Sequence, residues 1–283
     1  MEVPLVLQFI DFSVTSTTLY TPCIRSDLPE DIRVSPLSVV LKPTGRARII
    51  NDLSWPRVAN PKTCSPTPIS INASINMDNY RVKMANLNDL LMMIDNTDGE
   101  CWASKIDWAD AFKHIAIHPD DIKLQVFSFG GKYFADLTAI FGCSSSPAIF
   151  DSAAELILQL SCWMASLHRN TIAKVLDDCI CINKKDLVDK WSRSYLSVCS
   201  RVGVKLAPLD NIKAFLSSQS GTLLGVDFNF VEKTWTMDVL KINKILYILF
   251  DILENQFISE SKLETLCGKL THYMVILGGQ YER

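Results

Sequence analysis

Three aspartates of this sequence stand where a merely solvated carboxylate is disfavoured. Asp107 ends the apolar run 101–106, and the pair Asp177-Asp178 interrupts the apolar run 173–182. Aspartate is depleted from β-strands, and adjacent carboxylates raise one another's pKa unless a cation holds them. Mg²⁺ prefers carboxylate oxygens and keeps room for water and phosphate oxygens. Two Mg²⁺ ions (or Mn²⁺) held there would activate a hydroxyl nucleophile and stabilise a leaving pyrophosphate.

The plainer interpretation is that Asp177-Asp178 forms a polar turn, because aspartate favours turns. Taken alone, an Asp-Asp turn is more often structural than catalytic, and Asp107 alone is a weaker signal still. Nothing else in the sequence offers an equally concentrated set of hard oxygen ligands. The choice therefore depends on the motifs around these residues.

Apolar periodicity and turn residues predict the elements that must position the aspartates. Residues 101–141 predict consecutive strands, with a short edge at 115–118 and a hairpin around Gly130-Gly131. Residues 173–182 predict a hairpin with the two carboxylates at its turn. Earlier in the chain, the turn Pro43-Thr44-Gly45 separates two further β runs, 38–42 and 47–52.

Helical spacing predicts the remaining elements. One helix is opened by the capping box Ser261-x-x-Glu264. This order of strands and helices favours an α+β core with an added helical subdomain. The other predicted helices cover 87–94, a segment from Ser146-Pro147, 187–202 before Gly203, and 239–253.

Composition excludes several classes of protein. The chain has 48% hydrophobic and 21% charged residues, as globular proteins do, and no apolar run long enough to span a membrane. Its N-terminal residues lack the basic flank and cleavage site of a signal peptide. Nine cysteines without a CxxC pair indicate buried thiols in a reducing compartment. We therefore expect an intracellular protein, cytoplasmic or nuclear, that is neither secreted nor membrane-bound.

The charge distribution gives a mixed signal about nucleic acid. A net charge of −3 is unusual for a protein that grips a polyanion. Between residues 36 and 62, however, five basic residues accompany the single acid Asp52. They form either a solvated basic loop, which charge alone favours, or a phosphate-contacting segment. The five are Lys42, Arg46, Arg48, Arg57 and Lys62.

Three motifs around the aspartates together resemble those of retroelement reverse transcriptases. KIDWADAFKHIAIHPDD (105–121) resembles the first catalytic motif of that family, in which an aspartate ends a strand. VLDDCI (175–180) resembles the second, with Val175 where retroviral enzymes usually have tyrosine. Between them, IFGCSSSPAIFD (140–151) resembles the motif that contacts template and nucleotide.

The resemblance continues on both sides. LKPTGRARIINDLSWP (41–56) is similar to the fingers motif that contacts the incoming triphosphate, and LLGVDF (223–228) resembles the primer grip. LETLCGKLTHYMVILGG (263–279) looks like the start of the thumb. The motifs follow the family order over residues 34–279. The Leu-Asp-Asp form of the second catalytic motif, together with LAPLDNIKAF (206–215) and GTLLGVDF (221–228), looks closest to the tyrosine-recombinase retroelements of DIRS type.

This resemblance implies a right-hand polymerase, in which an antiparallel palm sheet packs on helices beside fingers and a short helical thumb. It divides the chain into an irregular N-terminal segment at 1–34, fingers at 35–100, a palm with returning fingers elements at 101–237, and a thumb with the start of the connection at 238–283. No ribonuclease H, integrase, protease or recombinase region is visible, so we expect other domains of a polyprotein as partners.

The resemblance also assigns residues. Asp107, Asp177 and Asp178 become catalytic ligands of two Mg²⁺ ions, and Phe112 becomes a steric gate whose ring would clash with a ribose 2′-hydroxyl. A core aromatic beside the strand is nearly as good an interpretation of Phe112. The residues implied in nucleotide binding are Lys42, Arg46, Arg48, Asp110, Phe112 and Gly142.

Two departures from the family pattern concern the implied nucleotide-binding site. Phe141 stands where many retroviral enzymes carry glutamine. The lysine that the family often uses to protonate pyrophosphate aligns best with Asp210, which leaves Lys205 or Lys213 as substitutes.

Three functions remain open at this point. The first is a reverse transcriptase that uses deoxynucleoside triphosphates and an RNA or DNA template with a primer. The second is a catalytically inactive or truncated descendant that binds nucleic acid or a protein. The third is an RNA-dependent RNA polymerase, which shares the carboxylate geometry. Such an enzyme needs space for the ribose 2′-hydroxyl, and the Phe112 ring would fill that space.

Overall fold

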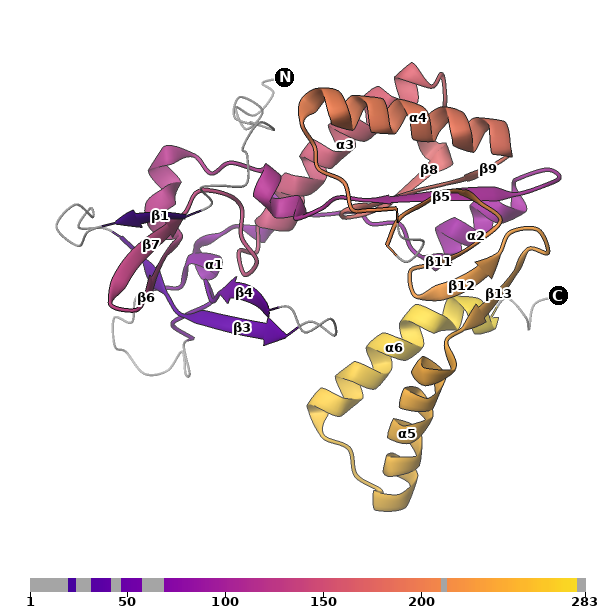
Figure 1. The fold of residues 1–283 in the computed structure, drawn as a ribbon. Helices are drawn as coiled ribbons and strands as arrows, with labels where there is room; N and C mark the ends of the chain where they lie inside the picture. The colour runs from indigo at the N-terminus through magenta and orange to yellow at the C-terminus, as the bar shows by residue number, and fades with distance from the viewer. Residues whose placement is uncertain (1–19, 24–31, 42–46, 58–68, 210–212, 279–283) are drawn as a thin grey trace. The chain divides into compact units, whose positions relative to one another are not determined.

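The computed structural model describes residues 20–23, 32–41, 47–57, 69–209 and 213–278 (Figure 1). Helices and mostly antiparallel sheets share these residues, so the predicted α+β fold class is confirmed. The chain divides into two compact units. Unit 1 takes the described parts of Met1–Lys83, Trp108–Ile157 and Val198–Lys205, and unit 2 takes those of Met84–Asp107, Leu158–Ser197 and Leu206–Arg283.

Unit 1 contains the predicted glycine hairpin. Strands β6 (Val126–Phe129) and β7 (Lys132–Asp136) pair in antiparallel fashion across Gly130-Gly131. Both glycines have positive φ, 58° and 75°, as a two-residue type I′ turn requires. The flanking strands β1 (Tyr20–Cys23) and β2 (Val34–Ser35) complete a sheet of order β1-β7-β6-β2.

The second predicted hairpin of unit 1 is also confirmed, as β3 (Leu37–Leu41) and β4 (Ala47–Asn51). The loop that carries Gly142 lies against the end of β4, where the Asn51 N–H donates to the Phe141 carbonyl at 3.2 Å. Gly142 has a φ of 111°, and a Cβ placed on it would meet the Asn51 carbonyl oxygen at 1.9 Å. Only glycine therefore fits this close approach of two backbones.

The prediction of consecutive strands across 101–141 is wrong in two places. Residues Ala111–His114 and Pro119–Leu124 form short 3₁₀ helices, η4 and η5, and the expected edge at 115–118 makes only an isolated bridge. Asp110 adopts a left-handed conformation that ends the extended chain, and Pro119 at the first helical position favours a helical turn. The other short helices of unit 1 are α1 (Ile71–Ser74) and η3 (Met77–Asn79).

Unit 2 is organised on a four-stranded antiparallel sheet. The predicted strand before Asp107 and the predicted Asp-Asp hairpin are both confirmed, and they are paired with each other in this sheet. An additional edge strand completes it. In sheet order the strands are β10 (Phe215–Ser218), β5 (Trp102–Asp107), β9 (Asp178–Asn183) and β8 (Ile172–Val175).

The two faces of this sheet are covered by different helices, α2 (Leu87–Asp95) and α4 (Lys185–Val202), which lie on opposite sides of β5 and β9 (Figure 1). Ile180 shares an apolar core with α2. Its neighbour Cys179 faces α4, with its sulfur 3.2 Å from the Tyr195 hydroxyl oxygen. Side chains alternate along a strand, so each residue of β9 is committed to one face.

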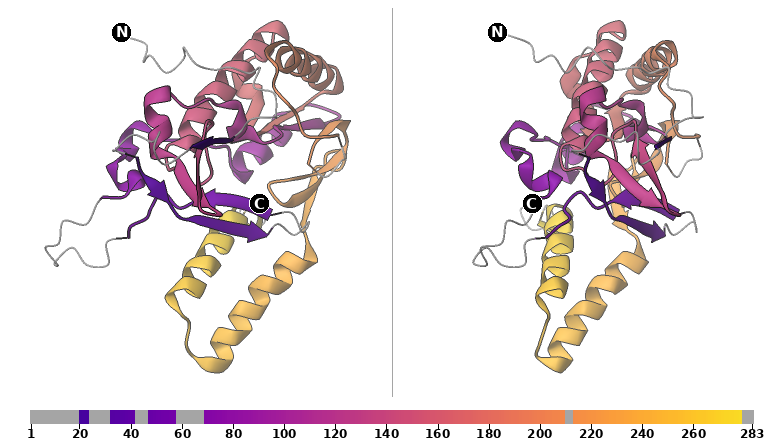
Figure 2. Two further views of the ribbon diagram at one scale, coloured as in Figure 1. Left: turned by 60° about the vertical axis from the view of Figure 1, so that its left-hand side comes forward. Right: turned by 90° about the vertical axis from the view of Figure 1, so that its left-hand side faces the viewer.

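The C-terminal part of unit 2 is a three-stranded sheet followed by a helical hairpin (Figure 2). No helix in the described residues combines the length and hydropathy that crossing a bilayer requires. Helices α3 (Ser146–Met164) and α4 each have residues in both units, and η6 spans Arg169–Thr171. The C-terminal elements are β11 (Ser220–Leu223), β12 (Val226–Asn229), β13 (Thr234–Met237), α5 (Val239–Asn255) and α6 (Glu260–Gly278).

Both helices of the hairpin hold the turn between β11 and β12. Leu224 and Gly225 form this turn with positive φ angles of 49° and 80°. The Lys241 ammonium of α5 donates to the Gly225 carbonyl at 2.7 Å, and His272 Nε2 of α6 lies 3.0 Å from the Leu224 carbonyl oxygen. Ile245 of α5 and Leu266 of α6 also share an apolar core with residues of β11 and β12. Polar contacts at the turn and apolar packing together hold the helical hairpin on the small sheet.

The predicted capping box at Ser261 is wrong. Helix α6 begins at Glu260, and the Lys262 N–H donates to the Ser259 hydroxyl at 3.4 Å. Ser259 precedes Ser261 by two residues, so the earlier serine caps the helix and Ser261 already lies inside it.

Replacing Gly142 with alanine should lower the free energy of unfolding by at least about 3 kcal/mol, because the added Cβ overlaps a backbone oxygen that cannot move alone. Chemical denaturation measures the change. Gly130→Ala is the matched control, since Gly130 also has positive φ but open space around it, and about 1 kcal/mol is expected there. Equal losses at the two positions would contradict the close approach at Gly142.

Candidate active site

Strand register brings two of the predicted aspartates face to face. Asp107 is the last residue of β5, Asp178 is the first of β9, and the two are direct cross-strand partners. Such partners have Cβ atoms about 4.5–5.5 Å apart. Asp177 lies in the adjoining turn, so all three aspartates are at one end of the same sheet.

The turn that carries Asp177 is tight. Val175 and Asp178 pair with each other, which leaves Leu176 and Asp177 as a two-residue loop. Leu176 has a φ of 54°, in the left-handed region, which costs a non-glycine residue about 1–2 kcal/mol. This local strain is of the kind that persists at functional sites, where surrounding structure enforces it.

The carboxylates are partly withdrawn from water and disfavour one another's charge. Asp107 is 9% exposed as a residue, and the Asp178 side chain is 24% exposed. Burial is the largest cause that raises the pKa of Asp178 to about 6, and the neighbouring Asp107 and Asp177 raise it further against the opposing effect of Lys105. A cation at this end of the sheet would relieve the repulsion.

Two lysines lie beside these carboxylates. Lys105 Nζ is 3.4 Å from an oxygen of Asp178, and Lys213 Nζ is 3.9 Å from an oxygen of Asp107. Of the two lysines that the sequence left open as proton donors, Lys213 is therefore next to the site. Lys205 belongs to unit 1, where its carbonyl accepts from the Ala109 N–H at 3.0 Å. Asp210 lies outside the described residues.

The donor set suits Mg²⁺ in part. Within the ranges that the structure describes, no three His, Cys, Asp or Glu side chains form a ready-made metal cage. Proteins commonly hold Mg²⁺ through one or two carboxylates, with waters and substrate phosphates as the other ligands. The facing, mutually repelling oxygens of Asp107 and Asp178 fit that pattern, and Asp177 is adjacent to them.

The predicted nucleotide-binding residues with described side chains all belong to unit 1. Phe112 is 6% exposed, and its ring centroid lies 4.9 Å from that of Phe141 and 5.8 Å from that of Phe150. The ring is thus packed as a core aromatic, and its role as a steric gate stays a prediction. Asp110 is exposed, and the loop glycine Gly142 makes its close approach to β4.

The basic candidates are only partly described. Lys42 and Arg46 lie outside the described residues. The backbone of Arg48 pairs with Val40 in the β3–β4 hairpin, but its side chain is not among the described ones. Contact of these residues with a triphosphate stays a prediction.

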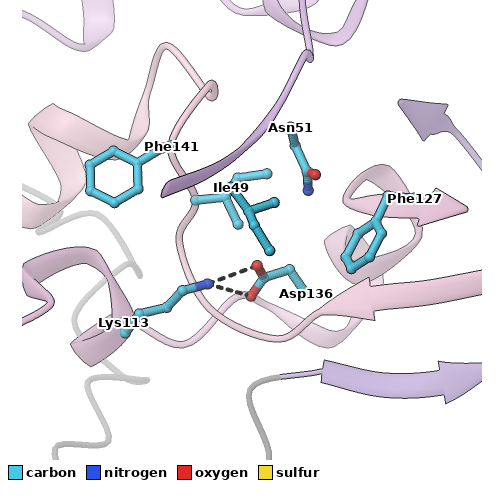
Figure 3. Close-up of a pocket in the computed structure, with 7 residues that line it drawn as sticks. Ile49, Asn51, Lys113, Phe127, Asp136 and Phe141 are labelled. Carbon is cyan, nitrogen blue, oxygen red and sulfur yellow. Dashed lines mark hydrogen bonds and ion pairs between the residues drawn. The ribbon is translucent and has the colours of Figure 1, made fainter. Parts of the chain in front are cut away.

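Sequence reasoning missed a buried ion pair in unit 1. The Lys113 ammonium donates to both oxygens of Asp136 at 2.7 and 2.9 Å, at the wall of a pocket that Asn51 and Phe141 also line (Figure 3). No local pattern links residues 23 positions apart. The pocket has a volume of about 30 Å³, which suits water and not a nucleotide.

Comparison with solved structures places this fold. No family model matches the sequence, and no curated protein matches it either. The foamy viral protease-reverse transcriptase in complex with double-stranded DNA matches with a TM-score of 0.62 at 16% identity, over 90% of this chain and 37% of that one. The foamy viral enzyme in complex with an RNA/DNA hybrid matches with a TM-score of 0.57 at 16% identity, over 85% and 27%.

These matches define a class of fold. The chain has a reverse transcriptase-like α+β fold, and it spans less than half the length of the solved chains that it resembles. At this identity the likeness concerns the fold alone.

Asp178→Asn should stabilise the metal-free chain at pH 8 by about 3 kcal/mol, because asparagine removes a charge whose pKa is raised from 3.8 to about 6. Well below pH 3.8 the carboxyl is neutral in both the folded and the unfolded chain, so the gain should vanish. The gain in stability should grow between pH 4 and 6, where the Asp178 carboxyl ionises in the unfolded chain before it does in the folded chain. Above pH 6 the gain should stay constant.

Thermal unfolding as a function of pH measures this gain. Asp98→Asn makes the same chemical change at an exposed aspartate and should give no such profile. An Asp178→Asn chain that is less stable than the wild type at pH 8 would contradict the electrostatic description of the site.

Proposed function

We propose that this chain is the catalytic core of an RNA-directed DNA polymerase, which extends a primer with deoxynucleoside triphosphates on an RNA or DNA template. The observation that carries the proposal is the cross-strand pair of Asp107 and Asp178, with Asp177 in the adjoining turn, in a fold that resembles reverse transcriptases. The sequence motifs in family order support it further.

The reaction transfers a nucleotidyl group. The primer 3′-oxygen forms a bond to the α-phosphorus of the triphosphate, the bond from that phosphorus to the bridging oxygen breaks, and pyrophosphate leaves. Two Mg²⁺ ions, or Mn²⁺, would supply activation of the hydroxyl and stabilisation of the leaving group. Asp107 and Asp178, which are direct cross-strand partners, and Asp177 in the adjoining turn would hold these ions, because a cation there would relieve the repulsion at Asp178.

Other residues would bind and select the nucleotide. Lys42, Arg46 and Arg48 are proposed to clamp the triphosphate, since arginine suits bidentate contact with phosphate. Asp110 and Gly142 would lie along the nucleotide. Phe112 would sit under the sugar and exclude a 2′-hydroxyl.

The proposed partners follow from the relatives and the motifs. Solved foamy viral enzymes of this fold are complexes with double-stranded DNA and with an RNA/DNA hybrid, and we assign primer–template duplexes to this chain by that likeness. From the Leu-Asp-Asp form of the second motif, we propose an affiliation with DIRS-type retroelements, whose other domains would act with this chain. An intracellular location, cytoplasmic or nuclear, fits these partners.

Primer extension tests the function directly. The purified chain, supplied with a primer on RNA and on DNA templates and with Mg²⁺ or Mn²⁺, should add deoxynucleotides. The double substitution Asp177→Asn/Asp178→Asn should reduce extension at least about 100-fold, because the residual oxygens cannot hold the ions that the reaction needs. Asp98→Asn, at an exposed carboxylate, should extend as the wild type does.

The outcome separates the proposal from its alternative. Extension that survives the double substitution would refute the assigned carboxylates. A folded chain that binds primer–template but never extends it, also with Mn²⁺, would favour an inactive descendant that acts as a binding module.

Replacing Phe112 with valine should raise incorporation of ribonucleotides relative to deoxynucleotides by about tenfold or more, because a smaller side chain leaves room for the 2′-hydroxyl. The ratio of kcat/KM for the two sugars measures this selectivity. Phe150→Leu reduces another ring of the same buried cluster and serves as the control for packing. Unchanged sugar selectivity in Phe112→Val would leave the ring as a core residue only.

A further inference from the structure

Lysine ammonium groups already occupy positions beside the candidate metal ligands. Lys105 reaches Asp178 at 3.4 Å and Lys213 reaches Asp107 at 3.9 Å. The two lysines and the two aspartates belong to the same unit. The carboxylates are therefore partly neutralised by the protein itself.

Strand geometry explains why Lys105 lies there. It precedes Asp107 by two residues on β5, so both side chains are on one face of the sheet. The direct cross-strand partner of Lys105 is Ile180, a fully buried residue that offers no polar contact. The long side chain instead reaches the diagonal neighbour Asp178, a distance that cross-strand geometry allows.

The charges of the aspartates and lysines determine how strongly a divalent cation would bind without a nucleotide. Among the residues that the structure describes, two ammonium groups offset part of the negative charge of the three aspartates. Magnesium gives up its hydration shell reluctantly and needs substantial negative charge in return. A triphosphate would bring that charge to the site together with the ion.

We propose that Lys105, with Lys213 in a weaker role, acts as an internal counter-ion that prevents tight binding of a divalent cation until a nucleoside triphosphate arrives. This inference rests on the proposed polymerase function. Lys105 is then a positioning residue, since it acts through Asp178 and touches no substrate.

The two lysines should differ in strength. The Lys105 side chain is 13% exposed, whereas that of Lys213 is 63% exposed. Water screens an exposed charge far more than a buried one. Removing the Lys105 charge should therefore tighten cation binding more than removing the Lys213 charge.

Mn²⁺ binding to the nucleotide-free full chain, followed at pH 8 by electron paramagnetic resonance of the free ion, tests this directly. Lys105→Met should lower the Kd for Mn²⁺ by about tenfold, the effect of one nearby unit charge on a divalent ion in a water-like dielectric. Lys213→Met should lower it by less. Wild-type chain with a non-hydrolysable deoxynucleoside triphosphate should bind Mn²⁺ more tightly than either component alone.

Matched variants separate charge from structure. Lys185→Met breaks an ion pair of the same kind, with Asp189 at 2.8 Å in the same unit but away from the three aspartates, and should leave Mn²⁺ binding unchanged. Lys105→Arg keeps the charge and should bind Mn²⁺ as weakly as the wild type. Lys105→Gln replaces Lys105→Met if methionine disturbs folding, which circular dichroism would reveal.

Each outcome has a separate meaning. If Lys105→Met or Lys105→Gln binds Mn²⁺ no more tightly than Lys185→Met, the counter-ion role is overturned while the polymerase function stands. If the tightened binding persists after Asp177→Asn/Asp178→Asn is added, the ion binds elsewhere and the counter-ion role is again overturned. If that double substitution also leaves primer extension unchanged, the proposed catalytic site itself fails.

Discussion

The candidate site depends on the register of β5 against β9. That register makes Asp107 and Asp178 direct partners, and a slip of one residue would turn one of them toward the opposite face of the sheet. Burial on both faces prevents the slip. Ile180 and Ile182 share the core with α2, whereas Cys179 contacts Tyr195 of α4. A shift of β9 by one residue would turn the isoleucines away from α2 and the cysteine away from α4.

Such a register has an electrostatic cost that the fold has to sustain. Burial at this end of the sheet, and then the neighbouring Asp107 and Asp177, raise the pKa of Asp178 to about 6 against the opposing effect of Lys105. The adjoining turn adds a left-handed Leu176. Neither feature helps the chain to fold, so the well-packed sheet and its helices must offset both. Selection for folding alone would not keep carboxylates that repel one another at this end of the sheet. Their presence is therefore a physical argument for a function that depends on a cation.

The parts of this structure that could be predicted from sequence are those with local signals. Gly130-Gly131 between two β runs identified one hairpin, and Asp177-Asp178 between two apolar runs identified the other. Strand β10 was missed because it pairs with β5 across more than a hundred residues and with an irregular register. The 3₁₀ helices at 111–114 and 119–124 were missed because their apolar spacing over so few residues also fits a strand. The ion pair of Lys105 with Asp178 likewise requires the register, which no sequence pattern states.

The packing of Phe141 against Phe112 gives a physical role to one departure from the pattern that the motifs resemble. The motif resemblance aligns Phe141 with a glutamine of many retroviral enzymes, and in this fold the ring centroid of Phe141 lies 4.9 Å from that of Phe112. A flexible amide would not provide this aromatic contact, which contributes beyond simple burial. The two positions therefore form one packing unit in this chain. Contact with Phe141 therefore helps to fix the position of the Phe112 ring. This holds both if Phe112 serves only the core and if it also selects the sugar.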